Sequence, residues 1–94
     1  MSLAIEWTDE AKETFAGIVS FIENKWTDRE AKNFVKRAQK LISLIAVQPY
    51  MYKASLYNDV RQAVITPQTS TFYQIHPECV TILFFWDNRQ EPIF

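Results

Sequence analysis

The chain has 94 residues, of which 48% are hydrophobic and 22% charged, and its formal net charge is −1. This length and composition predict a single globular domain over residues 1–94 and exclude an intrinsically disordered protein. No apolar run approaches the roughly 18 residues that span a membrane, and the N-terminus lacks the basic and apolar regions of a signal peptide, so we expect a cytoplasmic protein.

The near-neutral net charge conceals a segregation along the chain. Residues 1–30 carry a formal charge of −4, whereas residues 31–58 carry +5 and no acidic residue. Most of these cations recur at intervals of about one helical turn: Lys32, Lys36, Arg37 and Lys40. Such a face can bind an anionic partner, either nucleic acid or an acidic protein, although a solvated helix face has the same pattern.

The N-terminal half predicts a short strand followed by two helices. Residues 3–7 alternate as a strand does, and Thr8 then supplies the N-cap of a helix that extends to about Asn24. Thr27 opens a capping box for a second helix, which Pro49 ends. The short link predicts an antiparallel hairpin whose apolar faces both cover one side of a sheet.

The C-terminal half predicts a loop and three strands. The loop, residues 49–59, contains three tyrosines that we expect to cover the edge of the core: Tyr50, Tyr52 and Tyr57. Strands follow over residues 60–66, 71–76 and 80–87, separated by proline-containing turns. The resulting order β-α-α-β-β-β is typical of an α+β fold, with a helical hairpin packed on one face of a mainly antiparallel four-stranded sheet.

The last predicted strand is the most apolar segment of the chain. Its β-branched and aromatic side chains favour a central strand buried on both faces. A polar tail follows immediately and places Arg89 at the end of the sheet. In the strand over residues 60–66, alternation puts Val60 and Arg61 on opposite faces, so Arg61 is expected on the uncovered face if Val60 packs against the helices.

These two arginines are the best candidates for chemistry. With Lys53 and a tyrosine, Arg61 and Arg89 can bind phosphate and stabilise the charged transition state of RNA cleavage. The alternative interpretation is structural, in which either arginine fixes the end of the sheet by pairing with a nearby carboxylate: Asp59, Asp87 or Glu91.

Other common chemistries lack the residues that they need. The chain has one histidine, one cysteine and one glycine. His76 has no nucleophile elbow before it, and with Cys79 it supplies only part of a zinc motif, so we expect no metal site and no cofactor. Gly17 alone cannot form a phosphate-binding loop, and we interpret it as a position where another backbone packs closely on the helix.

Several short motifs, in their order, resemble the RelE/ParE superfamily of type II toxins, which includes plasmid stabilisation proteins. The resemblance covers nearly the whole chain and rests on an opening strand that ends in Trp7, a helical hairpin followed by Pro49, Val60-Arg61 at the start of the sheet, Tyr73 in the next strand, and the closing FFWDNRQEP. Within that ending, Asp87, Arg89, Gln90 and Pro92 are similar to ParE-like members.

The resemblance implies a small protein that arrests growth unless a cognate antitoxin binds it. RelE-like members cleave ribosome-bound mRNA with basic residues of the sheet and a C-terminal acid or base, whereas ParE-like members poison DNA gyrase. Arg61 matches the strand arginine that the superfamily shares, and Lys53 matches a basic position of the nucleases. Phe94, however, stands where a titratable tyrosine would be useful, and phenylalanine cannot exchange a proton. A sequence pI near 5.7 also disfavours charge-driven RNA binding, so we favour a ParE-like toxin that binds a protein target.

Two alternatives remain open. The chain is either a metal-independent, ribosome-dependent endoribonuclease, in which Arg61, Arg89 and Lys53 hold phosphate and Tyr73 transfers protons, or an inactive toxin fold that only binds antitoxin. In each case we expect an acidic or amphipathic antitoxin segment to lie along the basic face of the second helix, formed by Lys32, Lys36, Arg37 and Lys40, or to add a strand or helix over the sheet.

Overall fold

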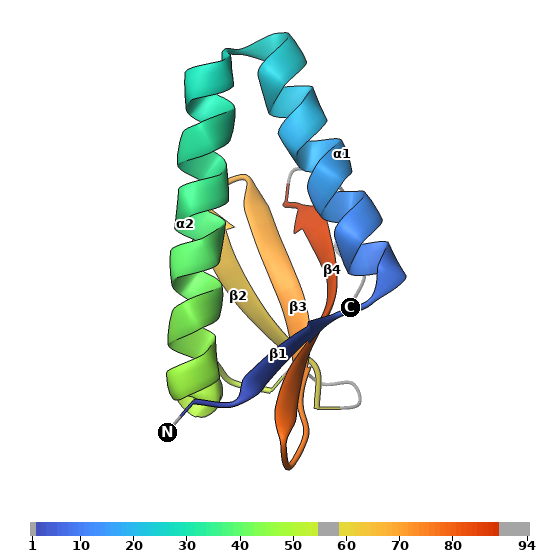
Figure 1. Cartoon of the computed structure of the whole chain (residues 1–94), viewed down its shortest axis with the longest axis vertical. Coiled ribbons are helices and arrows are strands. Elements are labelled where there is room, and N and C mark those ends of the chain that lie inside the picture. The colour runs from blue at the N-terminus through green and yellow to red at the C-terminus, as the bar shows by residue number, and fades with distance from the viewer. Residues whose placement is uncertain (1, 55–58, 89–94) are drawn as a thin grey trace.

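The computed structural model describes residues 2–54 and 59–88. Its elements are, in order, β1 (Ala4–Trp7), α1 (Asp9–Lys25), α2 (Asp28–Val47), the 3₁₀ helix η1 (Pro49–Met51), β2 (Arg61–Thr66), β3 (Thr69–Ile75) and β4 (Cys79–Asp87). The two helices form an antiparallel hairpin against one face of a four-stranded sheet (Figure 1). The predicted α+β fold and its β-α-α-β-β-β order are therefore confirmed.

The sheet has the strand order β1-β4-β3-β2. Strand β1 runs parallel to β4, and the other two pairs are antiparallel. Strand β4 is central, as predicted, but only its helix-facing residues Val80, Ile82 and Phe85 are buried, whereas Phe84 and Trp86 are half-buried. The prediction that both faces are buried is wrong, because α1 and α2 lie on the same side of the sheet (Figure 1).

Strand β3 begins two residues earlier than the sequence pattern predicts. Thr69 and Ser70 pair with Asp87 and Trp86 of β4, which reduces the β2–β3 turn to Pro67 and Gln68. Polar residues carry little strand signal by themselves. Here the two neighbouring strands hold them in the sheet and bury them, so tertiary pairing decides their conformation.

An aromatic cluster joins the sheet to the hairpin. The ring centroid of Phe85 on β4 lies 5.0 Å from Phe15 on α1 and 5.2 Å from Trp7 on β1. Phe15 also stacks on Phe34 of α2 at 5.7 Å. Each such pair contributes roughly 0.5–1.5 kcal/mol beyond its burial. Side chains from four elements therefore fix the position of both helices on the sheet.

Beyond the end of β1, side chains at the start of α1 supply hydrogen-bond partners to the edge of β4. Strand β1 ends at Trp7, opposite Ile82, and no strand formed by residues 2–54 or 59–88 lies beside the rest of β4 on that side. Instead, the Thr8 hydroxyl donates to the Leu83 carbonyl at 2.6 Å, and the Phe85 N–H donates to the Thr14 hydroxyl at 2.9 Å. Because buried backbone groups need partners, these two threonines hold the first turns of α1 against the sheet.

The far end of the hairpin extends beyond the strands (Figure 1). Gly17 lines the space between the helices and the strand ends, and a Cβ atom at this position would meet nothing within 4 Å. The prediction of close backbone packing at Gly17 is therefore wrong. The inner faces of the helices have lost their strand partners here, and the space is an open cavity.

Candidate functional site

The end of the sheet near η1 brings together two of the predicted site residues. Arg61 and Tyr73 are directly paired across β2 and β3. Tyr73 is fully buried, and its hydroxyl donates to the Pro49 carbonyl at 2.8 Å. Burial raises the pKa of Tyr73 to about 12, and the nearby Arg61 charge only partly counters this effect. Tyr73 therefore links the sheet to the C-terminal end of α2.

Arg61 makes two contacts with the segment that follows α2. Its Nη1 donates to the Tyr52 carbonyl, and its Cζ lies 4.9 Å from the centroid of the Tyr50 ring. Its Nε is buried and has no hydrogen-bond partner among the described residues. These contacts are structural, but they involve a carbonyl and a ring rather than the carboxylates that the sequence suggested.

The expected orientation of Arg61 is wrong. Val60 is buried, as assumed, yet Arg61 shares the helix-facing side of β2 with the buried residues Ala63 and Ile65. The reason is that Val60 precedes the first residue of the strand, so period-two alternation does not extend through it. Arg61 consequently points toward η1 and not toward the uncovered face.

The tyrosines of the 49–59 segment have different environments. Tyr52 is half-buried and packs against the core, as predicted. Tyr50, in contrast, is 71% exposed, and the prediction that it covers the core edge is wrong. Tyr57 lies outside the described residues.

The other two members of the proposed nuclease set do not complete a site among the described residues. Lys53 is exposed and precedes Ala54, which forms an isolated bridge with Arg61. Arg89 lies outside the described residues. The structure thus brings Arg61 and Tyr73 into contact with the same segment, residues 49–52, and leaves Lys53 exposed next to that segment.

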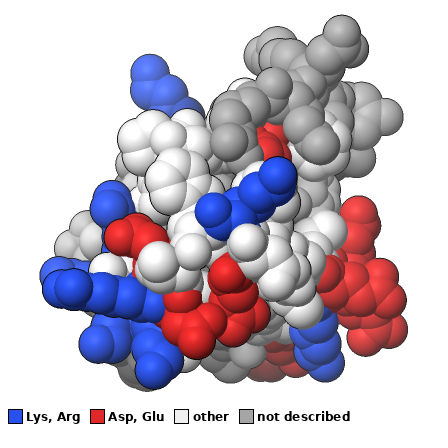
Figure 2. All heavy atoms as spheres, turned by 90° about the horizontal axis from the view of Figure 1, so that it is seen from above, with Lys and Arg blue, Asp and Glu red and all other residues white. Residues whose placement is uncertain are grey.

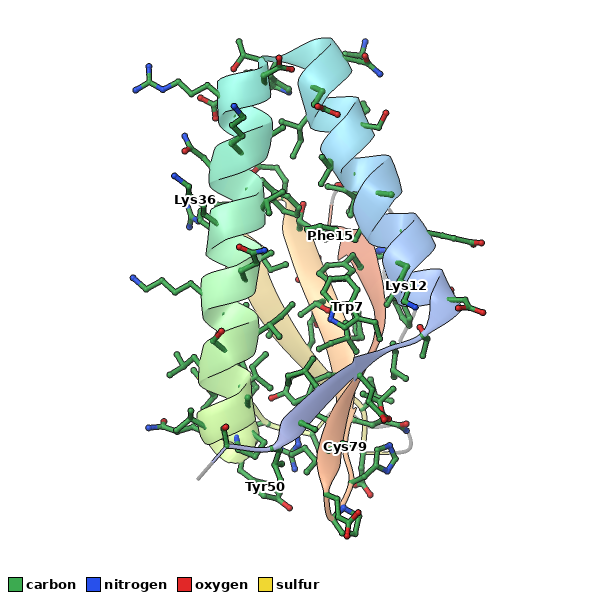
Figure 3. All side chains as sticks on the ribbon, in the orientation of Figure 1. Trp7, Lys12, Phe15, Lys36, Tyr50 and Cys79 are labelled. Atoms are coloured by element: carbon green, nitrogen blue, oxygen red, sulfur yellow. The ribbon has the colours of Figure 1, made fainter. Side chains whose placement is uncertain are left out.

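The four basic residues predicted to contact an antitoxin all lie exposed on α2: Lys32, Lys36, Arg37 and Lys40. Lys36 points away from the sheet on the outer side of the helix (Figure 3). Viewed from the hairpin end, several basic side chains gather on the α2 side and a group of acidic side chains lies at the opposite, α1 side, with further acidic side chains between them (Figure 2). The charge segregation along the sequence is therefore only partly a segregation in space.

A cavity of about 600 Å³ lies between the far half of the hairpin and the ends of β2, β3 and β4. Phe34 and Phe85 belong to its apolar wall, and Phe21 and Trp26 are 43% and 69% exposed. Arg37 and Asp87 add opposite charges to the lining. Sequence reasoning missed this feature, because it interpreted Gly17 as a site of close backbone packing rather than as a position beside open space.

Two further findings concern the described part of the chain. Within it, no helix has the length and hydropathy needed to cross a bilayer. Residues 2–54 and 59–88 also contain no group of three or more His, Cys, Asp or Glu side chains placed to hold a metal ion.

Solved structures of low sequence identity share this fold. A chain of a chromosomal ParDE toxin–antitoxin system from P. aeruginosa superposes with a TM-score of 0.78 at 13% identity, covering 92% of this chain and 96% of the other. A chain of the E. coli DinJ-YafQ toxin–antitoxin complex gives 0.63 at 11% identity over 95% and 96%. The conserved hypothetical protein HP0894 from Helicobacter pylori gives 0.62 at 13% identity over 94% and 97%.

Sequence comparison identifies the family. No curated protein sequence matches the chain, but a family model does. That model describes the ParE toxin of the type II toxin–antitoxin system parDE, and it matches residues 5–92. Because the match spans nearly the whole chain, this protein belongs to the ParE toxin family, as the resemblance of its motifs predicted.

Proposed function

We propose that the protein is a toxin that arrests growth by binding a protein target, DNA gyrase, and that a cognate antitoxin neutralises it. Membership of the ParE family supports the toxin role. The state of Tyr73 supports binding rather than RNA cleavage, and this residue carries the proposal.

A nuclease mechanism needs a group that exchanges protons near neutral pH. The Tyr73 hydroxyl is fully buried, its proton is already donated to the Pro49 carbonyl, and its pKa is about 12. Arg61 in turn is held by Tyr52 and Tyr50, so its guanidinium is only partly available to a phosphate. Both side chains act as supports of the α2 end in this proposal.

The antitoxin is proposed to bind along the basic residues of α2. No acidic residue occurs between Ala31 and Gln48, so this side of the helix presents positive charge without internal neutralisation. An acidic or amphipathic segment complements such a surface. Crystal structures of the E. coli DinJ-YafQ toxin–antitoxin complex, which share this fold, support an antitoxin as the partner.

Induced expression in cells, with and without the short reading frame adjacent to the gene, tests the choice of target. We expect growth arrest without the antitoxin, inhibition of gyrase supercoiling by the purified toxin, and no new mRNA ends in cleavage mapping. Tyr73→Phe should retain the arrest, since the ring still fills its site. Cleavage of ribosome-bound mRNA that Tyr73→Phe abolishes would instead establish the nuclease, and the absence of any arrest would indicate an inactive fold.

A charge-reversal pair tests the antitoxin site. Lys36→Glu combined with Lys40→Glu should weaken antitoxin binding at low salt, and the difference from wild type should shrink as added salt screens the charges. Lys12→Glu, on α1, is the matched control and should leave the affinity unchanged. Equal affinities for the double variant and the wild type at low salt would place the antitoxin elsewhere.

A further inference from the structure

The end of α2 presents an exposed apolar surface that the functions discussed so far do not use. Of the large hydrophobic residues that are exposed in the described chain, four fall within eight positions: Leu44 (43%), Val47 (55%), Tyr50 (71%) and Met51 (43%). We call them the 44–51 platform. Tyr50 lies beyond the C-terminal end of α2, at the opposite end of the molecule from the hairpin turn (Figure 3).

This platform continues the basic face of α2. Arg37, Lys40, Leu44 and Val47 follow one another at three- and four-residue spacing, so their side chains share one side of the helix. The side is cationic toward the hairpin turn and apolar toward η1. A partner that lies along it must therefore offer carboxylates at one end and apolar side chains at the other.

The exposed Tyr50 ring and the backbone around it are held by contacts with the sheet and with α2. Arg61 packs its guanidinium on the Tyr50 ring and donates to the Tyr52 carbonyl, and Tyr73 donates to the Pro49 carbonyl. Met51 N–H also donates to the Gln48 carbonyl at 3.2 Å. The residues on both sides of Tyr50 are thus fixed to the sheet and to α2. A rigid, exposed aromatic side chain loses little conformational entropy on binding, which is typical of the residues that dominate interface energies.

We propose that the 44–51 platform is the apolar half of the antitoxin-docking surface, that its occupant is an acidic amphipathic helix of the antitoxin, and that Arg61 is a positioning residue that presents Tyr50 to it. The proposal rests on the antitoxin-binding role proposed above. The carboxylates of that helix contact Arg37 and Lys40, and its apolar residues contact Leu44, Val47 and Tyr50. The arginine for which the sequence offers either phosphate binding or structural support thereby serves a protein interface.

Calorimetric titration of the full-length toxin with the purified product of the adjacent reading frame tests the docking site. We expect the double variant Leu44→Ser, Val47→Ser to bind about tenfold or more weakly, as for truncation of central interface residues, and the loss should persist at high salt because it is apolar. Val64→Ser is the matched control, since Val64 is 52% exposed but lies on the uncovered face of β2. It should bind as wild type does.

Four outcomes would overturn this proposal. Unchanged affinity of the Leu44/Val47 variant, with the Lys36/Lys40 charge reversal still weakening binding, would refute the apolar half and leave the proposed antitoxin role intact. Loss of affinity in Val64→Ser instead would locate the antitoxin on the uncovered face of the sheet. Loss of affinity in Phe21→Ser would locate it at the hairpin cavity. An antitoxin that does not bind the wild-type toxin at all would refute the proposed role together with this inference.

A double-mutant cycle tests the role of Arg61. Tyr50→Ala and Arg61→Lys should each weaken antitoxin binding by about fivefold to tenfold, and Arg61→Lys should have almost no further effect in the Tyr50→Ala background. Lysine keeps the charge but not the planar guanidinium that stacks on the ring. Independent, multiplying effects of the two substitutions would show that Arg61 does not act through Tyr50. Thermal melting of each variant identifies losses that come from unfolding.

Discussion

The two ends of the helical hairpin differ in how they meet the sheet. At the η1 end, hydrogen bonds from Tyr73 and Arg61 attach the segment after α2 to the strands. At the turn end, α1 and α2 pass beyond the strands and leave a cavity of about 600 Å³ beside Gly17. The η1 end is thus fixed by hydrogen bonds beneath an exposed apolar surface, whereas the turn end encloses an open cavity.

The starting point of α1 and the length of α2 explain this difference. Helix α1 follows Thr8, whose N–H donates to the carbonyl of Ile82 in the middle of β4, so its 17 residues, about 25 Å, run past the end of that strand. Helix α2 has 20 residues and is about 30 Å long, whereas β2 has six residues and is about 20 Å long. Since the helices are anchored to the sheet at the η1 end and by Thr8 and Thr14, the excess length projects at the turn. We therefore expect residues of the same type to contribute more to stability at the η1 end of the hairpin than at the turn end.

The largest expected effect is that of removing a buried isoleucine from the closed end. Ile45→Ala should lower the free energy of unfolding by about 3–4 kcal/mol, because Ile45 is fully buried in the core, whereas Ile22→Ala in the cavity wall should cost only about 1 kcal/mol. Both are helical, so helix propensity cancels in the comparison. Urea denaturation measures both values, and equal losses would contradict the distinction between the ends.

Removing the Tyr73 hydroxyl breaks the hydrogen bond that ties β3 to the segment after α2. Tyr73→Phe takes a hydrogen bond from the buried Pro49 carbonyl and should cost about 2 kcal/mol at pH 7. The folded state raises the pKa of Tyr73 from 10.0 to about 12, so the stabilisation is complete below pH 10 and is lost as the pH rises to about 12. Unfolding titrations should therefore show wild type and variant converging over this range, and a constant gap would contradict the assignment.

The two helix N-caps allow a smaller comparison. Thr8→Ala should cost about 1.5 kcal/mol, because Thr8 caps α1 through Ala11 N–H and also donates to the Leu83 carbonyl. Thr27→Ala, at the exposed start of α2 in the hairpin turn, removes only a cap and should cost about 0.5–1 kcal/mol. Thermal melting can rank them. A larger loss for Thr27 would mean that the turn end is more constrained than the cavity indicates.

A substitution at Gly17 is expected to have an effect as small as that of Thr27→Ala but of opposite sign. Gly17→Ala should stabilise the protein by about 0.5–1 kcal/mol, because alanine is the better helix former and its methyl group meets open space. Chemical denaturation can measure this gain. A loss of stability would mean that another group occupies the cavity beside Gly17.

Part of the candidate site could be predicted from the sequence. Lys32, Lys36, Arg37 and Lys40 are all exposed because helical periodicity keeps them off the buried face formed by Phe34, Ala38, Ile42 and Ile45. Arg61 and Tyr73 could be identified as candidates from the sequence, but their contacts could not, since the pairing of β2 with β3 and the position of η1 determine what each side chain touches.

The sequence by itself determined the elements, their order, the cationic side of α2 and the family, because caps, prolines, short motifs and periodic patterns are local signals. Only the tertiary structure decided that Thr69 and Ser70 are strand residues, that Tyr50 is exposed above Arg61, and that a cavity opens beside Gly17. These features depend on strand register and on how far the helices extend past the sheet. Both are set by contacts between distant segments, which no local pattern encodes.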